Sequence, residues 1–303
     1  MSEPIYKHIV TPVDLGGTSI AALHYAGLLA KKLGAEVTIV YADELATLYG
    51  GFDSEWLDTR VSPADETVRL EKALREFAAQ HLQNVAAPDI VVKPGHPVAT
   101  IVRVAKERGA DLIIMGTHGR RGWRRALAGS VADGVVRNAA QPVLVVPEHH
   151  DGQPLPEQIS RVVCPVNFSD AARVAACHAS ALTTAFGADL ILVHVSESAD
   201  PDSAEILEQF REWLPEEVRE HSSYRQVVLR GGPAERVLDC VEDLQADLLV
   251  IGAQLKWLRS ESVIGTTSER LLRFSPVPIL TVTRPLVPES SRKDRQTFES
   301  SAS

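Results

Sequence analysis

The chain has 303 residues, 45% of them hydrophobic and 23% charged, and its formal net charge is −9. This length suits two domains of about 100–150 residues, each able to bury its own core. The acidic balance argues against nonspecific binding of nucleic acid. No apolar run approaches the ~20 residues of a membrane-spanning helix, and no secretory signal pattern opens the chain. We therefore expect a cytoplasmic protein without a membrane or nucleic-acid partner.

Three cysteines without zinc-type spacing indicate buried, reduced thiols, at Cys164, Cys177 and Cys240.

Short apolar runs alternate with helical patterns along the first half of the chain. Such branched, nearly uninterrupted runs are typical of strands buried on both faces of a parallel sheet. We therefore predict an α/β fold, doubly wound, with right-handed crossovers and helices on both faces. The strands are expected at Ile9–Val13, Val37–Tyr41, Ile90–Val92, Leu112–Met115 and Val143–Val146, and helices at Ile20–Leu33, Glu66–Val85 and Val98–Arg108.

The segment between the fourth strand and the next helix is rich in glycine and arginine. Residues 116–130 read GTHGRRGWRRALAGS, directly after the apolar run 112–115. Glycine lets the backbone approach an anion closely, and the free N–H groups and dipole of a helix start attract phosphate. The segment therefore predicts a phosphate-binding loop. Two alternatives stay open: a strand-to-helix turn without a ligand, and a solvated basic helix start.

Ligands of doubly wound sheets bind beyond the carboxyl ends of the strands, where the strand order reverses. Asp14 ends the first predicted strand, Ala42 and Asp43 end the second, and Gly116 ends the fourth. We therefore expect all four at one crevice. Asp14 would accept a bond from a ligand, order the loop that follows, or cap the next helix. Asp43 and Glu44 would reach a Mg2+ ion or remain solvated.

The chain also repeats itself. His8–Asp14 (HIVTPVD) returns as Arg161–Asn167 (RVVCPVN), and Ala110–Gly116 (ADLIIMG) returns as Ala246–Gly252 (ADLLVIG). Internal repetition of this kind indicates two copies of one structural unit. The first copy is the longer one, and its extra residues lie around Glu44–Arg69.

Composition indicates where the two copies separate. Residues 148–158 carry prolines and a glycine, which break regular structure. We predict domains at 1–147 and 159–284, joined by a linker at 148–158. A serine-rich, disordered tail is expected at 285–303.

The spacing G-x2-G-x9-G-S, formed by Gly116, Gly119, Gly129 and Ser130, is neither the Walker loop nor the dinucleotide fingerprint. Together with I-V-T-P-V-D at Ile9–Asp14 and the A-D-L motif, it resembles the ATP-binding signature of the universal stress protein family. The resemblance implies a tandem protein of two Rossmann-like domains, each a five-stranded parallel sheet of the adenine nucleotide alpha hydrolase type. It also implies a sensor or regulatory module of the stress response that binds ATP, ADP or AMP, with or without Mg2+.

The resemblance carries ligand contacts onto particular positions. Asp14 would lie by the adenine and ribose, and Met115 would pack near the adenine or only in the core. Ser130 would donate its hydroxyl to a phosphate, cap the helix, or do both. The implied nucleotide-binding residues are Pro12, Asp14, Ala42, Met115, Gly116, His118, Gly119, Arg120, Gly129, Ser130 and Val131.

The second copy departs from this pattern at two positions. Asn167 stands where the first copy has Asp14, and Leu255 stands where it has Gly119. A leucine would bring a side chain to a loop where the backbone should approach phosphate, and it restricts positive φ. We therefore expect the second site to be empty or weakly binding.

No residue pattern in the chain indicates strong catalysis. No nucleophile has an adjacent base, and no acidic pair marks a metal site. Any ATP hydrolysis would be slow, because positioning and charge neutralisation alone would promote it. We predict no catalytic residue and assign no metal ligand. Two rival functions stay open: a slow ATPase or nucleotidyl-transfer enzyme, and an interaction scaffold that uses neither pocket.

The last strand of each copy, at Val143–Val146 and Ile279–Val282, is expected at a sheet edge, where unpaired backbone groups invite pairing. The family resemblance implies that these strands pair antiparallel, which would join the two domains as a pseudo-dimer within one chain. Association of two chains into a homodimer and the identity of any protein partner are left open.

Overall fold

The computed structural model describes residues 5–44, 63–85, 87–117, 129–147, 155–198, 203–220, 224–258 and 261–284. Some expectations fall outside these ranges. They concern the loop around residues 45–62, the linker at 148–154, the tail at 285–303, and most of the glycine- and arginine-rich loop, with His118, Gly119 and Arg120.

The described elements alternate between strand and helix in both halves. The first half contains β1 (His8–Pro12), α1 (Gly17–Leu33), β2 (Glu36–Asp43), α3 (Pro63–His81), β3 (Asp89–Pro94), α4 (Pro97–Glu107), β4 (Leu112–Gly116), α5 (Ser130–Asn138) and β5 (Val143–Val146). The second half contains β6 (Arg161–Pro165), α6 (Asp170–Phe186), β7 (Asp189–Ser196), α7 (Ser203–Trp213), α8 (Glu216–Arg219), β8 (Tyr224–Arg230), α9 (Pro233–Asp243), β9 (Leu248–Leu258), β10 (Glu261–Ile264), α10 (Thr266–Phe274) and β11 (Ile279–Arg284).

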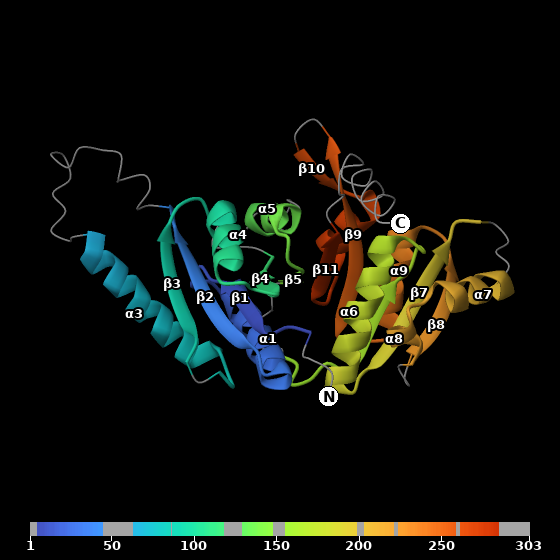
Figure 1. Ribbon diagram of the computed structural model, residues 1–303, viewed down its shortest axis with the longest axis horizontal. Helices are drawn as coiled ribbons and strands as arrows, with labels where there is room; N and C mark the ends of the chain where they lie inside the picture. The colour runs from blue at the N-terminus through green and yellow to red at the C-terminus, as the bar shows by residue number, and fades with distance from the viewer. Residues whose placement is uncertain are drawn as a thin grey trace, which may run out of the picture.

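One continuous sheet runs through both halves, in the order β3-β2-β1-β4-β5-β11-β9-β6-β7-β8 (Figure 1). Neighbouring strands of this path are parallel within each half. The α/β fold with two repeated parallel units is therefore confirmed. Each half also has the same strand order, with its reversal between β1 and β4 and between β6 and β9.

The two halves meet where β5 pairs with β11. This pairing is antiparallel, with Val145 opposite Ile279 and Leu144 opposite Leu280. The predicted pairing of the two edge strands is confirmed. Because β5 and β11 each gain a neighbour, neither is an open edge within the chain.

Helices cover both faces of the sheet and make two buried apolar layers. Side chains from α1, α3, α6, α7 and α8 pack on one face, in a cluster that includes Leu23, Leu74 and Phe210. Side chains from α4, α5, α9 and α10 pack on the other face, with Ile101, Val135 and others. Each layer contains residues of both halves, so burial of apolar area joins the halves as well as each half internally.

The repeated sequence motifs have matching structural roles. The Asp111 carboxylate accepts backbone N–H groups of Lys7 (2.6 Å) and His8 (3.0 Å) just before β1. The Asp247 carboxylate accepts those of Ser160 and Arg161 before β6, at 2.7 and 2.8 Å. Each A-D-L motif thus fixes the start of a central strand by satisfying backbone donors that the sheet leaves unpaired.

Glycine ends the first helix of each copy in the same way. Gly34 follows α1 with φ of 70°, and Gly187 follows α6 with φ of 69°. This left-handed conformation is easy for glycine and lets its N–H bond back to a carbonyl of the last turn. The repeated glycine therefore explains why both helices stop where the next strand begins.

Two helix predictions need correction at their ends. α1 begins at Gly17 rather than Ile20, since Gly16 is its N-cap residue. α3 spans Pro63–His81 rather than Glu66–Val85. Proline is tolerated in the first turn, and Asn84, with φ of 66°, turns the chain toward β3.

The second half contains a hairpin that was not predicted from the sequence. β9 continues for 11 residues, whereas its counterpart β4 has 5, and it turns back as β10. Leu255 pairs with Ile264, and Leu258 pairs with Glu261. The interpretation of Leu255 as a loop residue is therefore wrong: it lies in a strand, because an antiparallel partner satisfies its backbone.

A buried polar pair lies at the junction of the halves. Tyr6 is 1% exposed, and its hydroxyl lies 2.7 Å from Nδ1 of His178 on α6. The two rings are stacked with centroids 5.7 Å apart. Burial, and secondarily the Asp111 carboxylate, raises the pKa of Tyr6. The phenol therefore stays protonated, and the imidazole tautomer sets which of the two groups donates in this hydrogen bond.

Burial lowers the pKa of His178 below its ordinary value of 6.5. As the pH falls below about 6.5, the unfolded chain therefore takes up a proton before the folded chain does, and folding stability decreases. We predict that His178→Gln, which keeps an acceptor for Tyr6, flattens the pH dependence of the unfolding free energy between about pH 7 and about pH 5. Urea denaturation at a series of pH values measures this pH dependence.

Tyr6→Phe is the matched control, since it removes the hydrogen bond but keeps the buried imidazole. Its unfolding free energy should keep the wild-type pH dependence. Equal slopes for wild type and His178→Gln would show that this imidazole does not govern acid stability.

Candidate functional site

The candidate site lies at the carboxyl ends of β1, β2 and β4, where the strand order reverses. β1 is bonded to β2 on one side and to β4 on the other. The predicted residues Pro12, Ala42 and Gly116 lie at or next to these strand ends. A parallel sheet must place them together, because parallel strands end at the same edge.

Asp14 organises the loop that follows β1. Its Oδ1 accepts the backbone N–H of Gly16 at 2.9 Å and the hydroxyl of Ser19 at 2.6 Å. The N-cap position of α1 belongs to Gly16, so Asp14 is not the helix cap. Leu15 between them has φ of 61°. The Asp14 carboxylate therefore orders the loop that leads from β1 into α1.

The second half builds the same turn without the charge. Oδ1 of Asn167 accepts the backbone N–H of Ser169 at 3.2 Å and its hydroxyl at 2.6 Å. Phe168 has φ of 57°, as Leu15 has in the first half. The turn therefore needs a side-chain oxygen at this position, and the negative charge of Asp14 is additional to that need.

Gly116 is required by helix packing. A Cβ added there would lie 2.8 Å from the Cβ and from the carbonyl oxygen of Thr18 on α1. Its counterpart Gly252 faces α6 in the same way, since a Cβ there would lie 2.2 Å from the carbonyl oxygen of Ala171. Both positions thus need glycine whether or not a ligand binds, and no local sequence pattern indicates this requirement.

The start of α5 has the features of an anion site. Gly129 is its N-cap residue and makes no side-chain capping bond. Ser130 is exposed and Val131 is half-buried. The first backbone N–H groups of a helix have no partner inside it and carry its positive partial charge. These groups lie after β4, so they suit the phosphates of a ligand bound at the strand ends.

The remaining described candidates line the sheet. Met115 is 4% exposed and belongs to the apolar layer that α4 and α5 cover. Ala42 is half-buried in β2, opposite Lys93 of β3. Core packing therefore accounts for Met115, while Ala42 has some exposed surface. His118, Gly119 and Arg120 lie outside the described residues.

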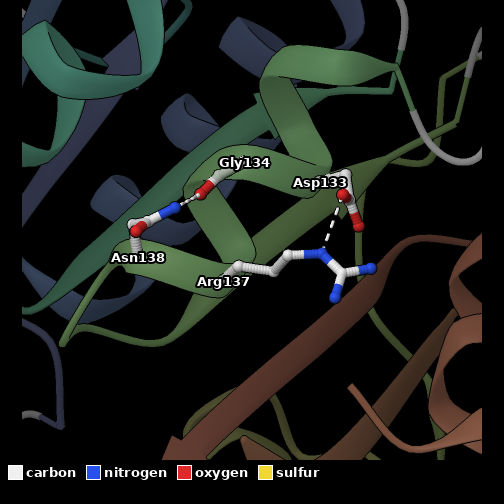
Figure 2. A network of polar contacts seen from close by, with 4 residues as sticks. All are labelled: Asp133, Gly134, Arg137 and Asn138. Carbon is white, nitrogen blue, oxygen red and sulfur yellow. Dashed lines mark hydrogen bonds and ion pairs between the residues drawn. The ribbon is translucent and has the colours of Figure 1, made fainter. Parts of the chain in front are cut away.

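An ion pair on α5 lies close to the candidate site. Asp133, in the first turn, and Arg137 are joined by a bond of 2.8 Å from Nε to Oδ2, with side chains 25% and 19% exposed. Figure 2 shows the pair on one side of the helix and the bond from Asn138 to the Gly134 carbonyl on the other (2.7 Å). Arg137 thus neutralises the charge of Asp133 near the start of α5, where a phosphate would bind.

The turn between β3 and α4 is a structural feature that the site predictions missed. Gly95, with φ of 139°, donates its N–H to the Asp43 carbonyl at 3.1 Å. Pro97 begins α4, and a Cβ on Gly134 of α5 would lie 2.6 Å from Val98. The Gly95-His96-Pro97 sequence before a helix pattern was the available signal. This turn joins the carboxyl end of β2 to the helices beside the site.

A separate hollow lies beside α1. Its volume is about 220 Å3, and it is lined by His24, Leu28, Lys31, Gln83, Asn84 and Glu157.

Across the described part of the chain, no three His, Cys, Asp or Glu side chains gather as a metal site would require. No helix within these residues has the length and apolar character needed to cross a membrane.

Comparison with known proteins places the chain among its relatives. A match to the universal stress protein family covers residues 5–147 and again residues 158–283. The chain belongs to the universal stress protein family. A universal stress protein of Methanocaldococcus jannaschii is 36% identical over 153 residues, covering 48% of this chain and 84% of that protein. One from Mycolicibacterium smegmatis is 24% identical over 297 residues, covering 90% and 96%.

A solved structure shows the same fold over nearly the whole chain. The crystal structure of a universal stress protein from Archaeoglobus fulgidus has a TM-score of 0.71 and 24% identity, covering 91% of this chain and 98% of that one. The tandem arrangement therefore occurs in relatives of this length.

We predict that Gly116→Ala and Gly252→Ala each lower the unfolding free energy in nucleotide-free protein, by about 1–3 kcal/mol, because each added methyl overpacks a strand against a helix. Gly17→Ala is the control, since a Cβ there meets nothing within 4 Å. Chemical denaturation measures all three. Wild-type stability of Gly116→Ala would contradict the packing role.

Proposed function

We propose that residues 1–147 form a domain that binds an adenine nucleotide, ATP in the first instance, and that residues 159–284 form a domain that binds it weakly or not at all. The observation that carries the proposal is the convergence of Asp14, Ala42, Gly116 and the uncapped start of α5 at one strand-order reversal. Membership of the universal stress protein family supports it.

Different site residues would contact different parts of the nucleotide. Asp14, held at the end of β1 by its loop bonds, would accept from the adenine or ribose. Pro12 and Ala42 would contact the base through backbone and apolar surface. The N–H groups at Ser130 and Val131 would hold phosphate, joined by the loop residues His118, Gly119 and Arg120. Mg2+ bound to the phosphates would neutralise part of their charge.

The asymmetry between the halves follows from charge and loop structure. Asn167 keeps the turn but has no charge, and the polypeptide after Gly252 continues as a strand instead of a glycine-rich loop. The start of α10, with Gly265 as an N-cap residue that makes no side-chain capping bond, resembles the start of α5. We propose that this remnant is insufficient for tight binding.

Calorimetric titration with ATP tests the proposal. We expect about one ATP per chain, bound with lower affinity by Asp14→Asn. The loss should be roughly tenfold, since charge-assisted hydrogen bonds exceed neutral ones by about 1.4 kcal/mol. Asn167 shows that an amide supports the same turn, so Asp14→Asn isolates the charge. The reverse variant Asn167→Asp is the matched control and should leave the stoichiometry unchanged.

The rival functions predict different results. Two equal sites per chain would refute the asymmetry. Purified protein that neither binds ATP nor releases a nucleotide on denaturation would favour the interaction scaffold. Turnover of Mg-ATP above background, lost in Asp14→Asn, would favour the slow ATPase or nucleotidyl-transfer enzyme.

The ion pair on α5 gives a second test of the phosphate position. We predict that Arg137→Met weakens ATP binding about fivefold, the effect of about 1 kcal/mol that a charge exerts near a helix terminus. It would leave the Asp133 carboxylate uncompensated beside the phosphates. Asp133→Asn should restore binding in the double variant. Titration of the four proteins forms a double-mutant cycle, and additive effects would argue against phosphate at the start of α5.

We further propose that the domain acts in the stress response as a sensor or regulatory module in the cytoplasm. The chain's three cysteines are all unpaired within the described residues, as a reducing compartment favours. Nucleotide occupancy would be the signal that such a module reports. Homodimer formation and an additional protein partner belong to the same proposal.

A further inference from the structure

The β9–β10 hairpin of the second half lies against the first half. β10 contacts α5, the helix whose start would hold phosphate. Figure 1 shows β10 at the top of the molecule, above the end of β9 and on the same side as α5. The segment that corresponds to the first half's glycine-rich loop has therefore become a strand pair that reaches across the junction.

The end of the hairpin is buried in an apolar layer. Ile264, the last residue of β10, is 2% exposed. It belongs to the same buried cluster as Ala132 and Val135 of α5. The next residue, Gly265, is the N-cap of α10. Ile264 thus lies in the apolar layer that α5 covers, at the end of the strand that contacts this helix and just before α10.

From the contact of β10 with α5 and the burial of Ile264 at the end of β10, we infer that Ile264 is a positioning residue for the nucleotide site of the first half. The inference rests on the proposed function. The start of α5 can present its N–H groups to phosphate only if the helix is held in place, and α5 is short, with 9 residues. Isolated helices of that length are marginal, so its position depends on packing. The second half supplies part of that packing through β10, which gives the degenerate copy a role at the intact site.

Titration of the full chain with ATP tests the inference. Ile264→Ala should weaken ATP binding about fivefold or more, the lower range of coupling between linked sites. Ile264→Val, which keeps most of the apolar contact and is the milder variant, should bind close to wild type. Ile191→Ala is the matched control: Ile191 is 0% exposed and belongs to the same layer, but it lies in β7, between β6 and β8. Its ATP affinity should stay within about twofold of wild type, although its stability falls.

Hydrogen exchange of the nucleotide-free proteins separates positioning from general stability. Ile264→Ala should increase exchange in α5 relative to the other helices, whereas Ile191→Ala should not. Wild-type affinity in Ile264→Ala, or an equal loss in Ile191→Ala, would overturn this inference and leave the proposed function standing. Absence of ATP binding by the wild-type chain would overturn both.

Discussion

The antiparallel pairing of β5 with β11 is the interaction on which the rest of the structure depends. Three residue pairs join the last strand of one half to the last strand of the other. Without this ladder, each half would end in an open edge of exposed backbone donors and acceptors. With it, one sheet and two apolar layers run through the whole chain. The same junction places α5 of one half beside β10 of the other.

Two separate demands are combined in the glycine signature of this chain. At Gly116 and Gly252 the demand is close packing of the first helix of each copy against the fourth strand of that copy. It is present in both halves and therefore carries no information about ligands. In our proposal, the demand for backbone close to phosphate applies to the residues that follow Gly116, and after this glycine the halves differ, because β9 continues where β4 stops. Helix packing alone thus explains why the second half keeps Gly252 of the glycine signature.

Asp14 and Asn167 show the same separation at a single position. Both side chains satisfy backbone and hydroxyl donors of the loop with one oxygen, and both loops hold a residue with positive φ. The structural requirement is therefore an acceptor, which either residue supplies. Only the first half adds a negative charge, and charge is what distinguishes a strong hydrogen bond to a ligand from a modest one. In our proposal, the first half binds the nucleotide. The second half holds α5 in place by packing β10 against it across the β5–β11 junction.

The sequence by itself determined the α/β class, the repeat and the positions of most strands. Strand periodicity, glycine caps and repeated motifs such as Ala110–Gly116 are local patterns that can be recognised in the sequence alone. It also predicted that Asp14, Ala42, Asp43 and Gly116 lie at one crevice, because parallel strands end together. The roles of His118, Gly119 and Arg120 stay predictions from the sequence.

Only the tertiary structure decided which partner each of these residues meets. The contact of Gly116 with Thr18, the stacking of Tyr6 on His178, and the antiparallel return of β10 join residues that no local pattern connects. Leu255 illustrates the reason: its own preference excluded a tight glycine turn, but its pairing with Ile264 made it part of a strand. Local preference limits the backbone conformation of a residue, whereas packing between distant segments selects its neighbours, and those neighbours determine its role at the site.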